Sequence, residues 1–299
     1  MSGIVQVKGN TYCIKTSTAY IPFYVIKDKD IIMLDCGYVL QDQKIKHLLD
    51  EGGYKVKAIV ISHAHTDHAG CANSFREYYG AKIYETQLDS SSTRSNETLR
   101  GLWPRIKMSI IEAKYQYMII QPDVIMDDGT DDIVVEGVTF KRMRLPGHIA
   151  GQYGFVTPDD VAYLADAAFS DDKIASMKLV FYQDWTLAEE TLLKIRELKN
   201  SVYILAHQGI TEDIQLTADH NLQYMHGLID QILALAPDWI NEDDYMESIF
   251  NHFEIHGNKV ERYRTVVNLI KNIIYYMEDH NMLENRMEDF RVQYRAVKE

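Results

Sequence analysis

Cysteine is scarce in this 299-residue sequence: there are three, Cys13, Cys36 and Cys71, and no two of them stand in a CxxC spacing. An odd number without paired spacing indicates neither a disulfide framework nor a zinc ribbon. The first residues show no charged region followed by an apolar one, and no apolar run reaches the roughly 18 residues that a membrane span needs. From these absences we expect a soluble, cytoplasmic protein with no membrane partner.

Positive charge is also in short supply. Thirty-one Lys and Arg residues stand against 44 Asp and Glu, which gives a net charge of -13. Excess negative charge repels a phosphate backbone unless the basic residues gather on one face, so we expect no nucleic-acid partner. The 46% of hydrophobic residues supply enough apolar material for one large layered domain or for a domain with an appendage.

Strand-like and helix-like stretches alternate along the first 235 residues. Predicted strands cover 4–7, 12–15, 19–26, 31–34 and 58–61, then 133–135, 138–145, 152–156, 161–164 and 202–205; predicted helices cover 41–51, 99–117 and 188–198. The run at 58–61 is apolar throughout, as expected of a strand buried on both faces. Strands, helix, strands and helix in two rough halves predict an α/β protein with two sheets covered by helices.

Two further segments need a separate interpretation. We predict one domain over residues 1–236 and a charged, helical C-terminal extension over 237–299, with helices at 245–253, 260–277 and 282–299. The amphipathic helix predicted at 99–117 can fold over a site as a lid, pair with a second subunit to form a homodimer, or pack on the exterior of the domain. The sequence leaves these three roles open.

Histidines gather directly after the buried strand at 58–61. His63, His65, Asp67 and His68 lie within six residues. In an extended chain residues i and i+2 point to the same side, so His63 and His65 can converge on one ion while a turn at Asp67 and His68 presents different ligands. One loop can therefore serve two adjacent metal sites.

Three more potential ligands follow later strands in the same way. His148 follows the strand at 138–145, Asp166 the strand at 161–164, and His207 the strand at 202–205. In layered α/β architectures the loops that leave the strand ends are where sites are assembled. We therefore expect four strands to deliver ligands to one edge.

Taken together, these segments resemble the metallo-β-lactamase superfamily. The resemblance rests on the HxHxDH motif at 63–68 and on Pro146-Gly147-His148, Ala165-Asp166 and Ala206-His207. It covers about residues 3 to 235. It implies a four-layer αββα sandwich, with a dinuclear metal site between its sheets, of the glyoxalase-type or lactonase-like metallohydrolases.

The resemblance also implies a ligand set. The first metal would be bound by His63, His65 and His148, the second by Asp67, His68 and His207, and Asp166 would bridge them. Asp35 matches an acid that orients a ligand imidazole. Departures from the residues frequent in the family, such as Ala150, Gln152 and Cys36, remove no ligand. Two zinc ions are the expected cofactors, although iron or manganese also accepts such ligands.

The predicted activity is hydrolysis of a small ester, thioester or lactone by a metal-bound hydroxide, with Asp67 as the catalytic residue that relays a proton. The expected partner is a small acyl substrate. A β-lactam hydrolase would need export, and a phosphodiester or RNA hydrolase would need a basic docking surface. A sulfur dioxygenase and a non-catalytic metal-binding regulator stay open as alternatives, although the complete ligand set argues against the regulator.

Overall fold

The computed structural model of the protein describes residues 3–103, 106–129 and 131–298. Its first half forms a seven-stranded sheet. In spatial order this sheet contains β1 (Gly3–Lys8), β2 (Thr11–Lys15), β3 (Tyr20–Val25), β4 (Asp30–Leu34), β5 (Lys55–Val60), β6 (Lys82–Thr86) and β7 (Val124–Met126). Strands β1 to β4 are an antiparallel meander, and β4 to β7 run parallel to one another.

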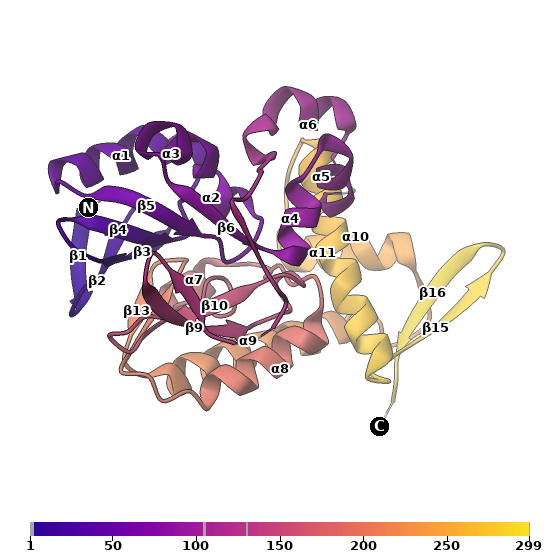
Figure 1. Ribbon diagram of the computed structural model, residues 1–299. Helices are drawn as coiled ribbons and strands as arrows, with labels where there is room; N and C mark the ends of the chain where they lie inside the picture. The colour runs from indigo at the N-terminus through magenta and orange to yellow at the C-terminus, as the bar shows by residue number, and fades with distance from the viewer. Residues whose placement is uncertain (1–2, 104–105, 130, 299) are drawn as a thin grey trace.

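A second, six-stranded sheet faces the first (Figure 1). Its spatial order is β13 (Gly209–Thr211), β12 (Val202–Leu205), β11 (Val161–Tyr163), β10 (Tyr153–Val156), β9 (Val138–Arg144) and β8 (Ile133–Val135). Buried side chains such as Leu34, Val60, Phe140 and Phe155 fill the space between the sheets. Strand β5 is covered by the second sheet on one face and by helices on the other, so both of its faces are buried. This burial explains the continuous apolar run that the sequence shows at β5.

Helices cover the outer faces of both sheets. Helices α1 (Asp42–Glu51) and α3 (Ala72–Tyr79) pack on the first sheet, and α8 (Trp185–Arg196) and α9 (Ile214–Leu233) pack on the second. Shorter helices lie in the connections: η1 (Val39–Gln41), α2 (Thr66–Ala69), α4 (Gln87–Thr93), η2 (Gln116–Met118) and α7 (Asp171–Ser176). The predicted α/β class and four-layer αββα sandwich are confirmed.

The prediction of one helix at 99–117 is wrong. The structure has two short helices there, α5 (Asn96–Leu102) and α6 (Met108–Lys114), and residues 104 and 105 of the predicted helix lie outside the described residues. A proline interrupts helical hydrogen bonding, and the sequence has Pro104 in the middle of the apolar periodicity. Trp103 follows α5 and packs against Tyr115, with 5.1 Å between the ring centroids.

The prediction that the C-terminal extension is helical throughout is also wrong. Helices α10 (Glu242–His252) and α11 (Val260–Asp279) form, but β14 (Ile240–Asn241), β15 (Leu283–Glu288) and β16 (Arg291–Ala296) make a small sheet in the order β14-β16-β15. Val292 and Tyr294 alternate with polar residues, which is the period of a strand. Asp289 and Phe290 both have positive φ and close a two-residue hairpin turn. Residue 299 lies outside the described residues.

The C-terminal helices share a core with the sandwich. Leu269, Ile273 and Met277 of α11 belong to the same buried cluster as Trp185 of α8 and Ile229 of α9. The β15–β16 hairpin instead projects away from the body of the molecule (Figure 1). The division of the chain at residue 237 stays a prediction.

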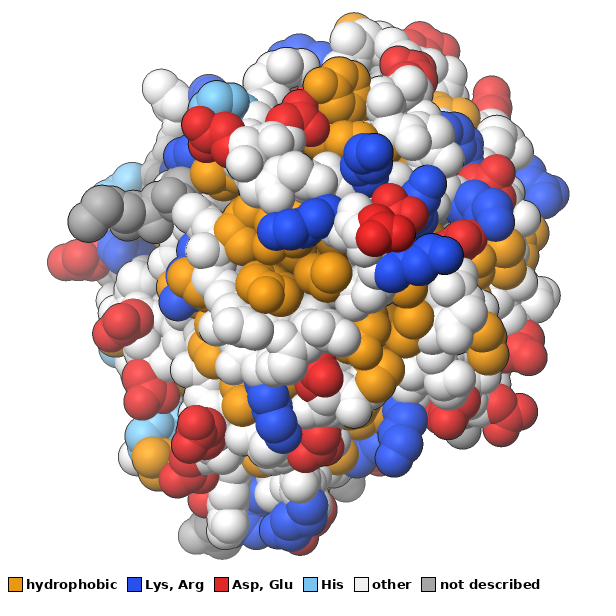
Figure 2. All heavy atoms as spheres, turned by 60° about the vertical axis from the view of Figure 1, so that its left-hand side comes forward, with side chains coloured by type: hydrophobic (Ala, Val, Ile, Leu, Met, Phe, Trp, Pro, Cys, Tyr) orange, Lys and Arg blue, Asp and Glu red, His pale blue; other side chains and the backbone are white. Residues whose placement is uncertain are grey.

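The surface mixes charges of both signs. Figure 2 shows basic and acidic side chains interspersed with apolar patches over one face. Among the described helices, none is both long and apolar enough to cross a bilayer.

Candidate metal centre

The loop that leaves β5 carries four of the predicted site residues. His63 and His65 lie in the loop, and Asp67 and His68 lie in the four-residue helix α2. His63 and His68 are buried, with 0% and 1% of their surface exposed. The turn after α2 is tight, since a Cβ at Gly70 would clash with the Thr66 carbonyl oxygen.

The other three predicted residues lie in the loops that follow β9, β11 and β12. His148 is reached through Gly147, whose φ is +126° and where a Cβ would clash with the backbone of Ala188 in α8. Only glycine allows this backbone to pass so close to the helix. Asp166 follows Ala165, which also has a positive φ, of +49°. Strained backbone next to a functional group is typical of sites that the surrounding fold holds in place.

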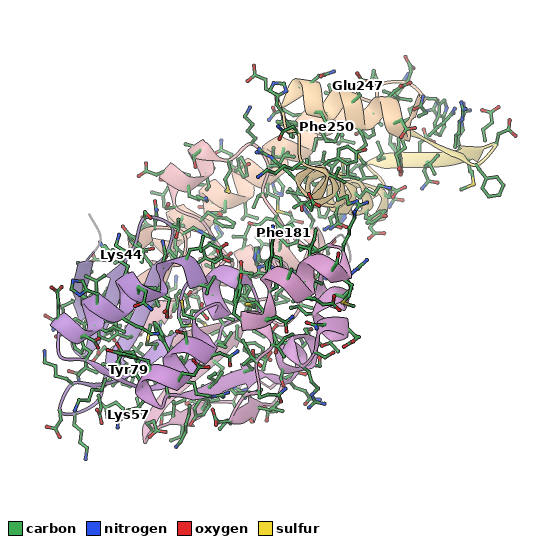
Figure 3. All side chains as sticks on the ribbon, turned by 90° about the horizontal axis from the view of Figure 1, so that it is seen from above. Lys44, Lys57, Tyr79, Phe181, Glu247 and Phe250 are labelled. Carbon is green, nitrogen blue, oxygen red and sulfur yellow. The ribbon has the colours of Figure 1, made fainter. Side chains whose placement is uncertain are left out.

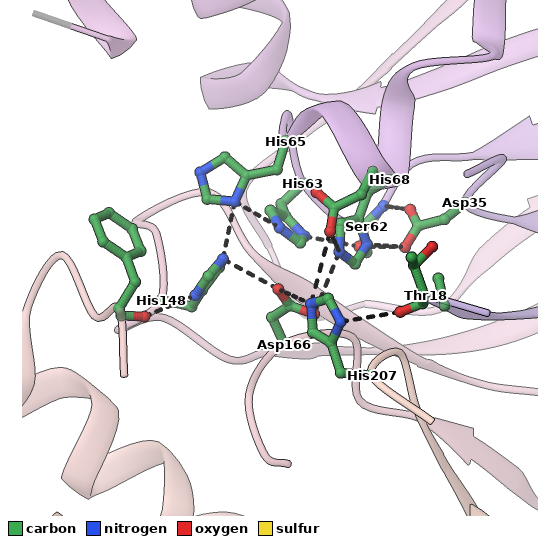
Figure 4. Close-up of polar contacts among 12 residues, drawn as sticks. Thr18, Asp35, Ser62, His63, His65, His68, His148, Asp166 and His207 are labelled. Carbon is green, nitrogen blue, oxygen red and sulfur yellow. Dashed lines mark hydrogen bonds and ion pairs between the residues drawn. The ribbon is translucent and has the colours of Figure 1, made fainter. Parts of the chain in front are cut away.

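The structure brings the three histidines of the first predicted set together. His65 Nδ1 lies 3.1 Å from His63 Nε2 and 2.8 Å from His148 Nε2 (Figure 4). Three ring nitrogens that face one point form a geometry suited to a single cation.

Asp166 lies between this set and the second one. Its Oδ1 lies 3.2 Å from His68 Nε2, and its Oδ2 lies 3.1 Å from His207 Nε2 and 3.3 Å from His148 Nε2. Asp67 Oδ2 completes the second set, 3.6 Å from His207 Nε2 and 3.9 Å from His68 Nε2. All seven predicted residues therefore lie in one constellation, with Asp166 at its centre.

The buried polar atoms of this constellation show that a metal fits it. Among the described residues, His68 Nε2 and Asp166 Oδ1 are buried and have no hydrogen-bond partner, although they lie 3.2 Å apart. An unpaired buried polar atom is costly, and a cation held between the nitrogen and the oxygen removes that cost for both. The His and Asp groups are thus consistent with a dinuclear metal site.

Hydrogen bonds around Asp35 fix which ring nitrogens face the site. Asp35 Oδ2 accepts from His68 Nδ1 at 2.7 Å and from the hydroxyl of Ser62 at 2.7 Å. Because the Ser62 hydroxyl donates to Asp35, its oxygen accepts from His63 Nδ1, 3.0 Å away. Tyr163 donates a further hydrogen bond to Asp35. Both imidazoles therefore turn an Nε2 lone pair toward the centre.

Backbone carbonyls orient two other rings in the same way. His148 Nδ1 donates to the Phe181 carbonyl at 3.0 Å, and His207 Nδ1 donates to the Thr18 carbonyl at 3.3 Å. Sequence reasoning singled out Asp35 but missed Ser62 and Tyr163. Ser62 stands next to His63 in the sequence and was a detectable signal; Tyr163 had none, since it comes from the other sheet.

Burial and the crowding of charges shift the pKa values in the site. Burial, together with the His68 and His65 rings, holds the pKa of His63 well below its usual range, and burial also lowers the pKa of His148. Burial alone would raise the pKa of Asp166, but the rings of His207 and His68 hold it well below its usual range. Asp166 in turn raises the pKa of His207, and Asp166 and Asp35 together raise the pKa of His68 against the effect of burial. Low pKa values at His63, His148 and Asp166 favour the neutral imidazole and the ionised carboxylate, which are the forms that bind metals.

A cavity of about 420 Å³ opens over the predicted ligands. Its other walls come from three separate regions: Trp103, Ile106 and Tyr115 from the α5–α6 segment, Phe181 from the loop before α8, and Thr265 and Leu269 from α11. In Figure 3, Phe181 lies where the sandwich meets the C-terminal helices. Of the two aromatic residues Trp103 and Tyr117 in the range 99–117, Trp103 lines the cavity, and Tyr117 is not among its described lining residues.

Comparison with known proteins agrees with this geometry. A sequence model described as the metallo-beta-lactamase superfamily matches residues 20–207. A hydroxyacylglutathione hydrolase of Haemophilus influenzae is 23% identical over 189 residues, covering 58% of this chain and 85% of its own. A probable metallo-hydrolase of Bacillus subtilis, YqgX, is 23% identical over 205 residues, covering 67% and 89%.

Solved structures with the same fold extend over the C-terminal region. A metallo-beta-lactamase family protein from Thermus thermophilus has a TM-score of 0.72 at 15% identity and covers 96% of this chain and 99% of its own. A beta-lactamase domain protein from Burkholderia ambifaria has a TM-score of 0.71 at 12% identity and covers 98% and 94%. The sandwich and the C-terminal helices and strands therefore recur together as one architecture.

Proposed function

This chain belongs to the metallo-beta-lactamase superfamily and is a metal-dependent hydrolase, and from that premise we propose that it hydrolyses a small ester, thioester or lactone with two zinc ions at its site. The observation that carries the proposal is the contrast inside one cavity. His65, His148 and Asp166 form a polar floor, whereas Trp103, Phe181 and Leu269 form an apolar wall. Such a cavity suits an acyl group whose reacting carbonyl lies at the floor.

Zinc is proposed because the ligand set contains only imidazole nitrogens and carboxylate oxygens, which zinc binds well. Two bound divalent cations supply Lewis acidity and a water of lowered pKa. Water adds its oxygen to the acyl carbon, the bond from that carbon to sulfur or oxygen breaks, and the leaving atom takes up a proton.

The chain's own residues have separate tasks in this reaction. Asp166 and the histidines would hold the two cations, and Asp35 keeps the His68 ring oriented. Asp67 lines the cavity, and its side chain is 34% exposed, so it can carry a proton between water and the leaving atom. Among the described lining residues there is no serine or cysteine that could serve as a covalent nucleophile.

The thioester version has additional support. The printed name of the Haemophilus influenzae relative describes a hydrolase of hydroxyacylglutathione, which is a thioester. We also propose a small-molecule substrate in the cytoplasm, because the chain carries a net charge of -13 and its three cysteines are buried and free. A homodimer formed through the α5–α6 segment stays a prediction.

The test is turnover of matched substrates by zinc-loaded protein. Panels of thioesters, esters and lactones are compared with a β-lactam and a simple phosphodiester at moderate salt. We expect turnover of at least one acyl panel, its loss on chelation and its return on addition of zinc. Turnover confined to the phosphodiester would move the protein to the nuclease class. His226→Ala serves as the control, since this exposed histidine pairs with Glu189 outside the site.

A further inference from the structure

A second cavity, of about 470 Å³, lies beside the metal cavity and is lined by basic residues. Arg100 and Lys107 come from the α5–α6 segment, and Arg264 and Lys271 come from α11. No described lining residue carries a carboxylate. In a chain with a net charge of -13, four cations around one cavity form a local field of the opposite sign. We call this cavity the cationic groove.

The cationic groove and the metal cavity share a wall. Ile106 lines both of them. On α11, Thr265 and Leu269 line the metal cavity, whereas Arg264 and Lys271 line the groove. Residues at these spacings form neighbouring stripes along one helix. A single extended molecule can therefore reach from the metal centre, over Ile106, into the groove.

An aromatic ring adds a second kind of contact in the groove. Tyr263 lines it and is 58% exposed. An exposed ring offers a face on which a nucleobase stacks. Glu242 lies 2.8 Å from Lys271 Nζ and offsets part of its charge. Arg100, Lys107 and Arg264 are therefore the cationic side chains of the groove that are best placed to donate hydrogen bonds to an anion.

We propose that the groove binds the phosphates of a nucleotide-bearing thiol carrier, so that the substrate is the acyl thioester of such a carrier. This inference rests on the proposed hydrolase function and names its leaving group. Arginine forks match phosphate oxygens with paired hydrogen bonds, and several cations suit a ligand with several negative charges. Hydrolysis adds water to the acyl carbon, breaks the carbon–sulfur bond and releases the carrier with its thiol protonated.

The test compares two thioesters that carry the same acyl group. One is the coenzyme A thioester, and the other is the thioester of N-acetylcysteamine, which lacks the phosphates and the base. We expect zinc-loaded protein to favour the coenzyme A thioester in kcat/KM. Arg264→Ala should lower that preference about tenfold through KM, as expected for the loss of one hydrogen bond to a charged group. High salt should weaken the preference as well.

Arg262→Ala is the matched control. It removes the same charge from the same helix, but Arg262 lines a different cavity. An equal preference for the two thioesters in the unmodified protein, or an equal effect of R262A and R264A, would overturn the inference while leaving the hydrolase intact.

Binding of free coenzyme A and of ADP, measured by calorimetry, gives a readout that needs no turnover. Binding that weakens in R264A but not in R262A supports the groove even when no thioester is cleaved, a result that would contradict only the hydrolase. Binding of an RNA oligonucleotide in the absence of ADP and coenzyme A binding would contradict a small carrier and indicate a polymer instead.

Discussion

The metal centre and the C-terminal region that closes over it are built in opposite ways. The centre joins polar groups from four strand ends, and hydrogen bonds to Asp35 or to backbone carbonyls orient its rings. Helix α11 is held by apolar packing of residues such as Leu269 and Ile273. The metal centre consists of His and Asp side chains, which can bind metal ions. Helix α11 contributes apolar side chains that affect the site only through their position beside it.

This contrast separates reactivity from selectivity. Changes at the strand ends should alter metal content and turnover together, because the ligands and their orienting groups form one network. Changes in α11 should alter substrate choice and leave metal content intact, because the helix contributes wall and no ligand. The following predictions test that separation, from the largest expected effect to the smallest.

His148→Ala should cause the largest loss. It removes one of three ring nitrogens that face the first metal position, so metal content should fall by about one ion per chain. Turnover should fall by more than about a hundredfold, since even the loss of an orienting partner costs about 10–100-fold. Elemental analysis and kinetics of the zinc-loaded protein measure both. Unchanged metal content and turnover would remove His148 from the site; His226→Ala should show neither effect.

Asp35→Asn should weaken the metal centre without replacing any predicted ligand. Asparagine tolerates the positive φ of +65° at this position, so the backbone is preserved. It replaces one carboxylate oxygen with an NH2 group, which cannot accept. Either the Ser62 backbone N–H, which donates to Oδ1, or His68 and the Ser62 hydroxyl, which donate to Oδ2, then lose their acceptor. Metal affinity should fall about 10–100-fold. Competition with a coloured chelator measures it, and full affinity in this variant would show that His68 needs no orientation.

Leu269→Ala should shift substrate preference at unchanged metal content. The residue lines the metal cavity from α11, and its shortening enlarges the acyl pocket. Preference for longer over shorter acyl chains should rise about tenfold, the scale of one to two methylene groups. Leu216→Ala, at an exposed position on α9, is the control. A lower zinc content in L269A would break the separation between the two regions.

Phe290→Gly should have the smallest effect, confined to the C-terminal hairpin. Phe290 is 96% exposed and has a φ of +60°, a conformation that costs a phenylalanine energy and glycine none. The variant places Gly after Asp289, a favoured pair for this turn, and should raise the free energy of unfolding by up to about 1 kcal/mol. Phe290→Ala keeps the strain and should give no gain. Urea denaturation measures both, and zinc content should not change.

Local sequence patterns were sufficient to predict those elements whose structure depends on neighbouring residues in the chain. The strands β1 to β5 and β8 to β12 follow runs whose alternation or apolar continuity is set by neighbouring residues. The single helix at 99–117 failed because the apolar period crossed Pro104. The helix predicted at 282–299 failed because charged residues obscured the period of two in β15 and β16, which pair with each other as a hairpin through the turn at Asp289 and Phe290.

The sequence by itself determined the family resemblance and the seven predicted site residues, because HxHxDH and the residues after three later strands are local features of residue type. Tertiary structure alone decided that Asp166 lies between the two sets, that Tyr163 from the second sheet donates to Asp35, and that α11 walls the cavity. The physical reason is that these contacts join segments far apart in the chain. Their geometry depends on the packing of whole layers, and no periodicity in any one segment encodes it.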